Sequence, residues 1–90
     1  MRLDVFLKKC CIVKRRTEAK RACDNGIVTI DDHIAKASRE LVAGQRICIA
    51  FTDRLLEFDV IEVPQGNVAR KDAPNYVRIL RDEIQESEFI

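Results

Sequence analysis

Glycine, proline, aromatic residues and long apolar runs are all scarce in this chain of 90 residues, which holds 3 Gly, 2 Pro, 1 Tyr and no Trp. So little glycine and proline excludes collagen-like and low-complexity classes of protein. No apolar run approaches the roughly 18 residues that a membrane-spanning helix needs, so no such helix is expected. The N-terminal residues carry charge inside their apolar stretch and show no small-residue cleavage site, so we expect no signal peptide.

There is also only one histidine, His33, and no glycine-rich phosphate loop. Without a histidine at a recognisable spacing from a serine or cysteine, nucleophilic catalysis has no support. A single histidine also gives the cysteines no regular zinc-ligand spacing. We therefore expect a protein that is not an enzyme, with no catalytic residue, metal or cofactor, and we place His33 in a turn.

The four cysteines are Cys10, Cys11, Cys23 and Cys48. The adjacent pair Cys10 and Cys11 suits neither an ordinary disulfide nor a CxxC site, and no signal peptide points to an oxidising compartment. We expect all four to be reduced and to act as small core residues. A cytoplasmic location follows from this interpretation.

What the chain has in abundance is charge, and this charge is unevenly distributed along a chain whose formal net charge is only +1. The first 21 residues hold eight basic and two acidic side chains (net +6), whereas the remainder holds eight basic and thirteen acidic ones (net −5). A nearly neutral protein with its positive charge in one quarter of its length is expected to have an anionic partner, with nucleic acid the first candidate.

Two short N-terminal helices are predicted. The first covers residues 3–9, because its leucine and phenylalanine side chains fall on one face at i, i+3 and i+4. The second covers residues 16–25; its apolar side is made of alanine and cysteine, and Gly26 ends it. Alternating apolar residues then predict strands, at residues 28–30, from residue 34, at 46–51 and at 56–63.

A C-terminal helix is also predicted, after a polar linker over residues 64–72. Asp72-Ala73-Pro74 resembles a helix start, and an apolar stripe follows, consisting of Tyr76, Val77, Leu80 and Ile84. We expect this stripe to pack within the molecule and the acidic residues beyond Glu83 to fray. The predicted fold class is thus α+β, with two N-terminal helices packed on a small antiparallel sheet and a third helix at the C-terminus.

Several motifs occur in an order that resembles the S-four (S4) RNA-binding domain. They are Arg2-Leu3-Asp4 with Phe6-Leu7, then Lys14-Arg15-Arg16-Thr17 with Ala19 and Gly26, then Val28-Thr29-Ile30 before a turn, and finally Lys36-Ala37-Ser38 and Gly44. The resemblance covers residues 2 to about 51 and implies a small S-four (αL-type) domain. We assign residues 1–63 to it and residues 64–90 to a linker and C-terminal helix or tail.

Two departures from the family pattern affect local structure. The serine that the family has before its second helix is Arg15 here. The Asn-Gly pair of the family's first turn is Asp31-Asp32, and two aspartates favour a two-residue type I′ turn less than Asn-Gly does.

Among stand-alone S-four proteins, the chain is similar to the RqcP family of bacterial ribosome-quality-control factors. This resemblance implies binding to obstructed large ribosomal subunits through their rRNA and peptidyl-tRNA. There the family supports C-terminal alanine tailing of stalled nascent chains by an RqcH-type factor. The alternative within the same domain class is a heat-shock-type S-four protein that recycles large subunits. Such proteins usually carry a longer, basic tail, whereas the tail of this chain is short and acidic.

The predicted RNA-binding residues are eight basic side chains: Arg2, Lys8, Lys9, Lys14, Arg15, Arg16, Lys20 and Lys36. Arg16 and Lys20 share a helix face at i, i+4, which we expect to point outward without a structural role. The start of the second helix offers free N–H groups to a phosphate. Because no aromatic residue lies among these cations, recognition is expected to rely on RNA shape and backbone rather than on base stacking.

Other interpretations of the same residues remain open. Arg2 is equally well explained by a salt bridge and Lys36 by an ordinary surface position, while Asp4 is expected to be structural. One alternative function is a protein-interaction adaptor whose acidic sheet, with Glu57, Asp59 and Glu62, binds a basic partner. Another is a regulatory S-four protein that acts on tRNA or another RNA away from the ribosome. We expect a monomer.

Overall fold

The two α-helices come first along the chain, and the strands follow, with a short 3₁₀ helix before the last strand. The computed structural model describes residues 1–84. Its elements are α1 (Leu3–Lys9), α2 (Arg16–Asp24), β1 (Val28–Ile30), β2 (His33–Ile34), β3 (Arg46–Ala50), β4 (Arg54–Val60), the 3₁₀ helix η1 (Arg70–Tyr76) and β5 (Val77–Ile84). Within these residues, no helix is long and apolar enough to cross a membrane.

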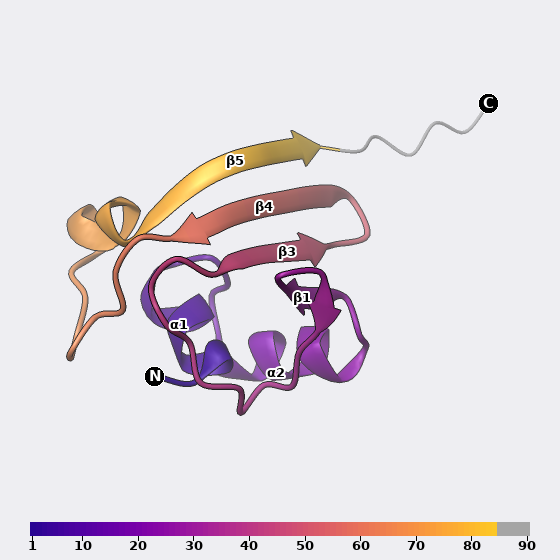
Figure 1. The fold of residues 1–90 in the computed structure, drawn as a ribbon, viewed down its shortest axis with the longest axis horizontal. Coiled ribbons are helices and arrows are strands. Elements are labelled where there is room, and N and C mark those ends of the chain that lie inside the picture. The colour runs from indigo at the N-terminus through magenta and orange to yellow at the C-terminus, as the bar shows by residue number, and fades with distance from the viewer. Residues whose placement is uncertain (85–90) are drawn as a thin grey trace.

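The strands form one antiparallel sheet in the order β2-β1-β3-β4-β5. Both α-helices lie on one side of it, close to β1 and β3, and β5 forms the edge farthest from them (Figure 1). The predicted α+β class, with two N-terminal helices packed on a small antiparallel sheet, is confirmed. The two helices occupy the predicted segments to within one residue.

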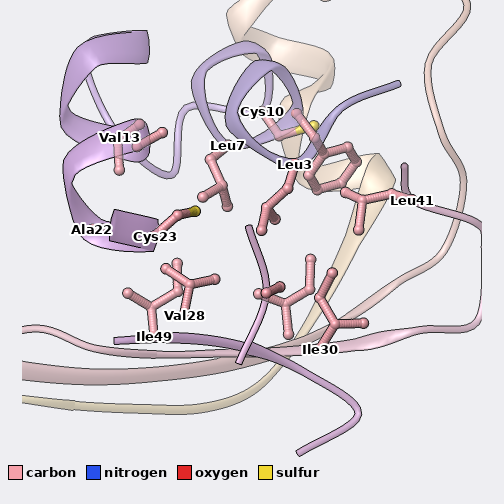
Figure 2. Close-up of a cluster of buried hydrophobic side chains, with 14 of the residues drawn as sticks. Leu3, Leu7, Cys10, Val13, Ala22, Cys23, Val28, Ile30, Leu41 and Ile49 are labelled. Atoms are coloured by element: carbon pink, nitrogen blue, oxygen red, sulfur yellow. The ribbon is translucent and has the colours of Figure 1, made fainter. Parts of the chain in front are cut away.

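The core fills the space between the helices and the inner face of the sheet. Leu3 and Leu7 of α1 point toward Val28, Ile30 and Ile49 of the strands (Figure 2), and all five side chains are buried. The predicted helical spacing thus places α1's apolar stripe on the sheet.

Strand β4 shows the two-residue period of a sheet with one covered face. Leu56, Phe58 and Val60 are buried, and the residues between them are partly exposed. The ring of Phe58 stacks on that of Phe6 from α1, with centroids 6.5 Å apart. This contact fixes the distance between the first helix and the centre of the sheet.

A segment that precedes β3 holds the start of α1. The amide of Leu3 donates to the carbonyl of Arg39 at 2.8 Å, and the amide of Asp4 donates to that of Ala37 at 3.1 Å. These bonds satisfy two N–H groups that an isolated helix would leave without partners. Residues 37–39 therefore fix the position and direction of the Arg2–Asp4 segment.

The turn between β1 and β2 has type I′ geometry, which Asp31-Asp32 was expected to favour less than Asn-Gly does. Asp31 and Asp32 have φ values of 49° and 70°, and Ile30 pairs with His33 around them, as in a type I′ turn. The Asp31 side chain accepts a bond from the Arg46 amide at 3.0 Å, and the Asp31 amide donates to the Arg46 carbonyl at 2.8 Å. These bonds to β3 offset the cost of positive φ at an aspartate.

The predicted C-terminal helix is wrong. Residues 70–76 form a 3₁₀ helix, and the segment that carries most of the apolar stripe is β5, which pairs with β4 at every residue except Leu80. Its guanidinium–carboxylate link, from Arg54 to Asp82 at 2.7 and 3.0 Å, adds to the backbone ladder. The predicted frayed tail, residues 85–90, lies outside the described residues, and the domain boundary at 63/64 stays a prediction.

The expectation that every cysteine is a core residue holds for two of the four. Cys10 and Cys23 are buried, and this burial raises the pKa of each thiol to about 11. Cys48 is partly exposed on β3, and Cys11 is exposed at a positive φ of 61°. None of the four forms a disulfide. Sequence reasoning could not place Cys11, which lies two residues after the end of α1.

Candidate nucleic-acid interface

A buried carboxylate, that of Asp4, lies beneath the basic N-terminal surface. Its side chain is only 2% exposed. Arg2 donates to it from Nε and Nη2 at 3.2 and 3.1 Å, and Arg16 donates from Nε at 3.1 Å. The Val5 amide donates a further bond at 2.8 Å. Asp4 therefore joins the start of α1 to the first residue of α2.

The ionisation of Asp4 is set by these partners. Burial by itself would raise the pKa of the carboxyl, but the hydrogen bond and charge of Arg16, the Val5 amide and the charge of Arg2 together hold the pKa below its ordinary value. Asp4 is thus a charged structural residue, as predicted. Arg2 makes the salt bridge that was one of its two expected roles.

Arg16 combines a structural contact with exposure. Only its Nε bonds Asp4, and its side chain is 56% exposed. The expectation of an outward side chain without a structural role is therefore wrong in its second half. Within residues 1–84 the two terminal amino groups of this guanidinium make no hydrogen bond, so they face outward as donors.

We expect Arg16→Ala to lower the free energy of unfolding by about 1 kcal/mol, because one charged hydrogen bond to Asp4 is lost while the remaining partners of that carboxylate stay in place. The value is at the low end for charged bonds because solvent screens a side chain this exposed. Urea unfolding followed by far-ultraviolet circular dichroism measures the change. An unchanged midpoint would show that the Arg16–Asp4 contact does not contribute to stability.

Beside Arg16 the surface is hollowed into a basic groove of about 550 Å³. Its lining consists of Val5, Lys8, Lys9, Cys11, Arg16, Asn67, Val68 and Arg70. A second hollow adjoins it and adds Lys14 to Lys8, Cys11 and Arg70. We call the two together the α1 groove. No carboxylate lines either of them, so an anion placed there meets only cationic and neutral groups.

The remaining predicted residues lie elsewhere. Arg2, Lys20 and Lys36 line a separate hollow that also contains Asp24. Lys20 donates to Asp24 at 2.8 Å, and this hydrogen bond raises the pKa of the ammonium. The structure therefore does not gather all eight predicted side chains in one cavity. Seven of them are divided between the α1 groove and this second site, which are linked through Asp4, and Arg15 lines neither.

Arg15 precedes α2 and is exposed. No side chain caps the helix at this end, so the first amides of α2 are open to solvent or to an anion. Across residues 1–84, no cluster of three or more His, Cys, Asp or Glu side chains is placed to hold a metal ion.

Sequence reasoning missed one basic residue of the α1 groove, Arg70. It lies 54 residues beyond Arg16 in the chain, in the segment that was predicted to be a polar linker. The only signal available was the basic pair Arg70-Lys71 in this segment. Its proximity to α1 depends on how the chain returns after β4, which no local pattern reveals.

Comparison with known proteins gives consistent matches. Residues 1–47 match the S4 domain family. A protein of Halalkalibacterium halodurans named RQC P-site tRNA stabilizing factor is 34% identical, over 98% of this chain and 100% of its own length. Proteins of the same name from Bacillus subtilis and Helicobacter pylori are 36% and 37% identical, over 92% and 86% of this chain and 95% and 93% of their own.

Solved structures with the same fold include two small proteins. The solution structure of the hypothetical protein HP1423 superposes with a TM-score of 0.78 at 36% identity, over 92% of this chain and all of that one. The trimeric heat shock protein 15 of Vibrio cholerae superposes with a TM-score of 0.79 at 21% identity, over 88% and 80% of the two chains. The latter likeness concerns the fold alone.

Proposed function

Because this chain belongs to the S4 domain family and is similar over nearly its full length to the RQC P-site tRNA stabilizing factors, we propose that it is an RNA-binding factor of ribosome-associated quality control. It binds obstructed large ribosomal subunits that carry peptidyl-tRNA and stabilises this tRNA in the P site. It acts in the cytoplasm by binding and not by catalysis. C-terminal tailing of the stalled chain by an RqcH-type factor continues on the same subunit.

The observation that carries this proposal is the α1 groove. Lys8, Lys14 and Arg16 surround a hollow without a carboxylate, next to the uncapped start of α2. Phosphates of an RNA backbone are the anions that such a surface suits, since guanidinium groups bind them in a fork and ammonium groups supply point charges. Only aliphatic and polar side chains accompany the cations, which favours recognition of RNA shape over base stacking.

The basic residues lie at two separate sites, which suits a protein that binds two RNAs at once and holds one in place on the other. The α1 groove binds one RNA backbone, and the hollow with Arg2 and Lys36 binds a second. A rigid link between the two sites, through Asp4, raises the effective concentration of the second RNA once the first is bound. A single copy of the protein is sufficient for this role.

The adaptor alternative finds less support on the sheet. Phe58 and Val60 point to the helices, so Asp59 between them lies on the outer face. Arg46 of the neighbouring strand pairs with Asp59 at 3.0 Å. Glu57 lies opposite Arg81 in the sheet register. The Arg46–Asp59 pair thus neutralises one of the acidic side chains that a basic protein partner would require.

Sedimentation tests the proposed function. In a sucrose gradient of a cell lysate, the protein is expected to migrate with free large subunits, and more of it after translation is stalled. Purified large subunits that carry peptidyl-tRNA should bind it at least 10-fold more tightly than vacant ones, since the second RNA contact is present only in the former. Equal affinity for both kinds of subunit would contradict stabilisation of the tRNA, and a pool that stays at the top of the gradient would contradict ribosome binding.

A further inference from the structure

The α1 groove has two walls that come from distant parts of the sequence. One is formed by α1 and the first residue of α2, with Lys8 and Arg16. The other is formed by residues 67–70, which follow β4 and lie beyond the stretch that matches the S4 domain family, residues 1–47. Arg70 borders both hollows of the groove.

Lys9 fixes the second wall to the first. Its Nζ donates to the carbonyl of Gly66 at 3.2 Å and to Oδ1 of Asn67 at 3.3 Å. Just beyond, the amide of Asp72 donates to the carbonyl of Ala69 at 2.9 Å and begins η1. Hydrogen bonds thus hold the chain on both sides of Arg70, and the fold defines the position of this residue relative to α1.

Charge distinguishes the α1 groove from the other hollows described on the molecule. The one with Arg2 and the one along the outer side of α2 both include Asp24. A third, beside the β1–β2 turn, includes Asp31, Asp32 and Asp59. The larger hollow of the α1 groove combines four lysine and arginine side chains with no acid, and the volume of this hollow, about 550 Å³, lies within the range of small-ligand sites. A phosphodiester with an attached sugar fits this chemistry and size.

We propose that Arg70 is an RNA-contacting residue that closes the α1 groove over a backbone phosphate, opposite Lys8 and Arg16, and that Lys9 positions it. This inference rests on the proposed function and adds to it a contact from outside the S4 match. The phosphate lies between two cationic walls instead of on one helix face. Lys9 acts through residues 66 and 67 and not through the RNA, because its ammonium donates to them.

The variant Arg70→Gln tests the contact, and Arg78→Gln is its matched control. Arg78 is an exposed arginine on β5, opposite Asp59 on the outer face of the sheet. Affinity is measured for purified large subunits that carry peptidyl-tRNA, over a series of salt concentrations. Arg70→Gln is expected to bind about 10-fold more weakly, with a salt dependence shallower by roughly one ion. Arg78→Gln is expected to bind within about 2-fold of the wild type, as surface substitutions away from a site do.

A double-mutant cycle tests the positioning role of Lys9. Lys9→Met keeps the length of the side chain and removes its donors. It is expected to weaken binding by about 3- to 10-fold alone and to add little to Arg70→Gln, because both changes act on one contact. Additive losses would assign Lys9 its own RNA contact. Wild-type binding by a folded Arg70→Gln protein overturns the inference and leaves the proposed function intact, whereas failure of the wild-type protein to bind large subunits overturns the function itself.

Discussion

Replacing Asp4 by asparagine is expected to lower the free energy of unfolding by about 2–3 kcal/mol at neutral pH. The amide is nearly isosteric with the carboxyl, so packing changes little, but the amide lacks the charge that two guanidinium groups share. Its NH₂ group would face an arginine donor in place of an acceptor. The loss exceeds that of Arg16→Ala because every bond to the buried group is affected.

Urea unfolding measured by circular dichroism gives the free energy, and Asp24→Asn provides the control. Asp24 is also paired with a basic residue, Lys20, but both side chains are more than half exposed. Exposed i, i+4 pairs contribute little, so this control is expected to unfold close to the wild-type midpoint. Equal midpoints for the two variants would show that burial does not strengthen the Asp4 interactions.

The contribution of the Asp4 ion pairs to the free energy of unfolding depends on pH in a defined direction. Because the folded pKa of Asp4 lies below its ordinary value of 3.8, its ion pairs contribute fully above that value and are lost as the pH falls through the folded pKa. The stability difference between wild type and Asp4→Asn is therefore expected to be constant from about pH 5 to 7 and to narrow below about pH 3.8. A difference that does not change with pH in this range would mean that the carboxyl is not the group responsible.

The largest effect on binding is expected from reversal of two lysines of the α1 groove. In the double variant Lys8→Glu/Lys14→Glu, affinity for large subunits that carry peptidyl-tRNA should fall by at least about 100-fold, since two cationic contacts are lost and two repulsive charges are added. Neither lysine forms an ion pair within residues 1–84, so the fold loses no contact. Circular dichroism and the thermal midpoint should stay close to wild type.

The control is a reversal of equal size on the opposite surface. Arg78→Glu/Arg81→Glu changes the net charge by the same amount, from +1 to −3, but both residues lie on the outer face of β5. Binding within about 5-fold of wild type is expected, because the remaining effect is long-range and screened by salt. Comparable losses in the two variants would show that RNA binding follows total charge and has no defined site.

The elements that sequence predicts well here are those whose partners are close in the chain. The spacing of Leu3, Phe6 and Leu7 defines α1 unambiguously, and Gly26, with its φ of 74°, ends the α2 region as expected. The segment Val77–Ile84 was harder to predict, because the spacing of its apolar residues fits one face of a helix as well as a strand. The available edge of β4, with which this segment pairs, decides in favour of a strand. No pattern within residues 72–84 reveals that edge.

In the candidate site, too, residues near one another in the chain were predicted, and those that only the fold brings together were not. Motif order predicted Arg2, Lys8 and Arg16 as RNA-binding residues, and these positions lie within the first 47 residues, which match the S4 domain family. The sequence predicted a salt bridge only as one role of Arg2 and did not predict the bond from Arg16 to Asp4, because these two residues are twelve positions apart in the chain. Arg70 required the fold, since its place beside α1 results from the tether between Lys9 and residues 66–67.

Strand β5 presents a problem that any exposed sheet edge creates, which is unwanted growth of the sheet by pairing with other chains. Its outer side has no neighbouring strand within residues 1–84, and most of its eight residues are exposed. Four of the eight are charged, and the register shifts opposite Glu57 and Phe58, which interrupts the regular ladder at Leu80. Charged side chains and irregular pairing are devices that discourage edge-to-edge aggregation. Substitutions that replace Arg78 and Arg81 by valine would therefore be expected to lower solubility before they lower stability, even though neither residue lines the α1 groove.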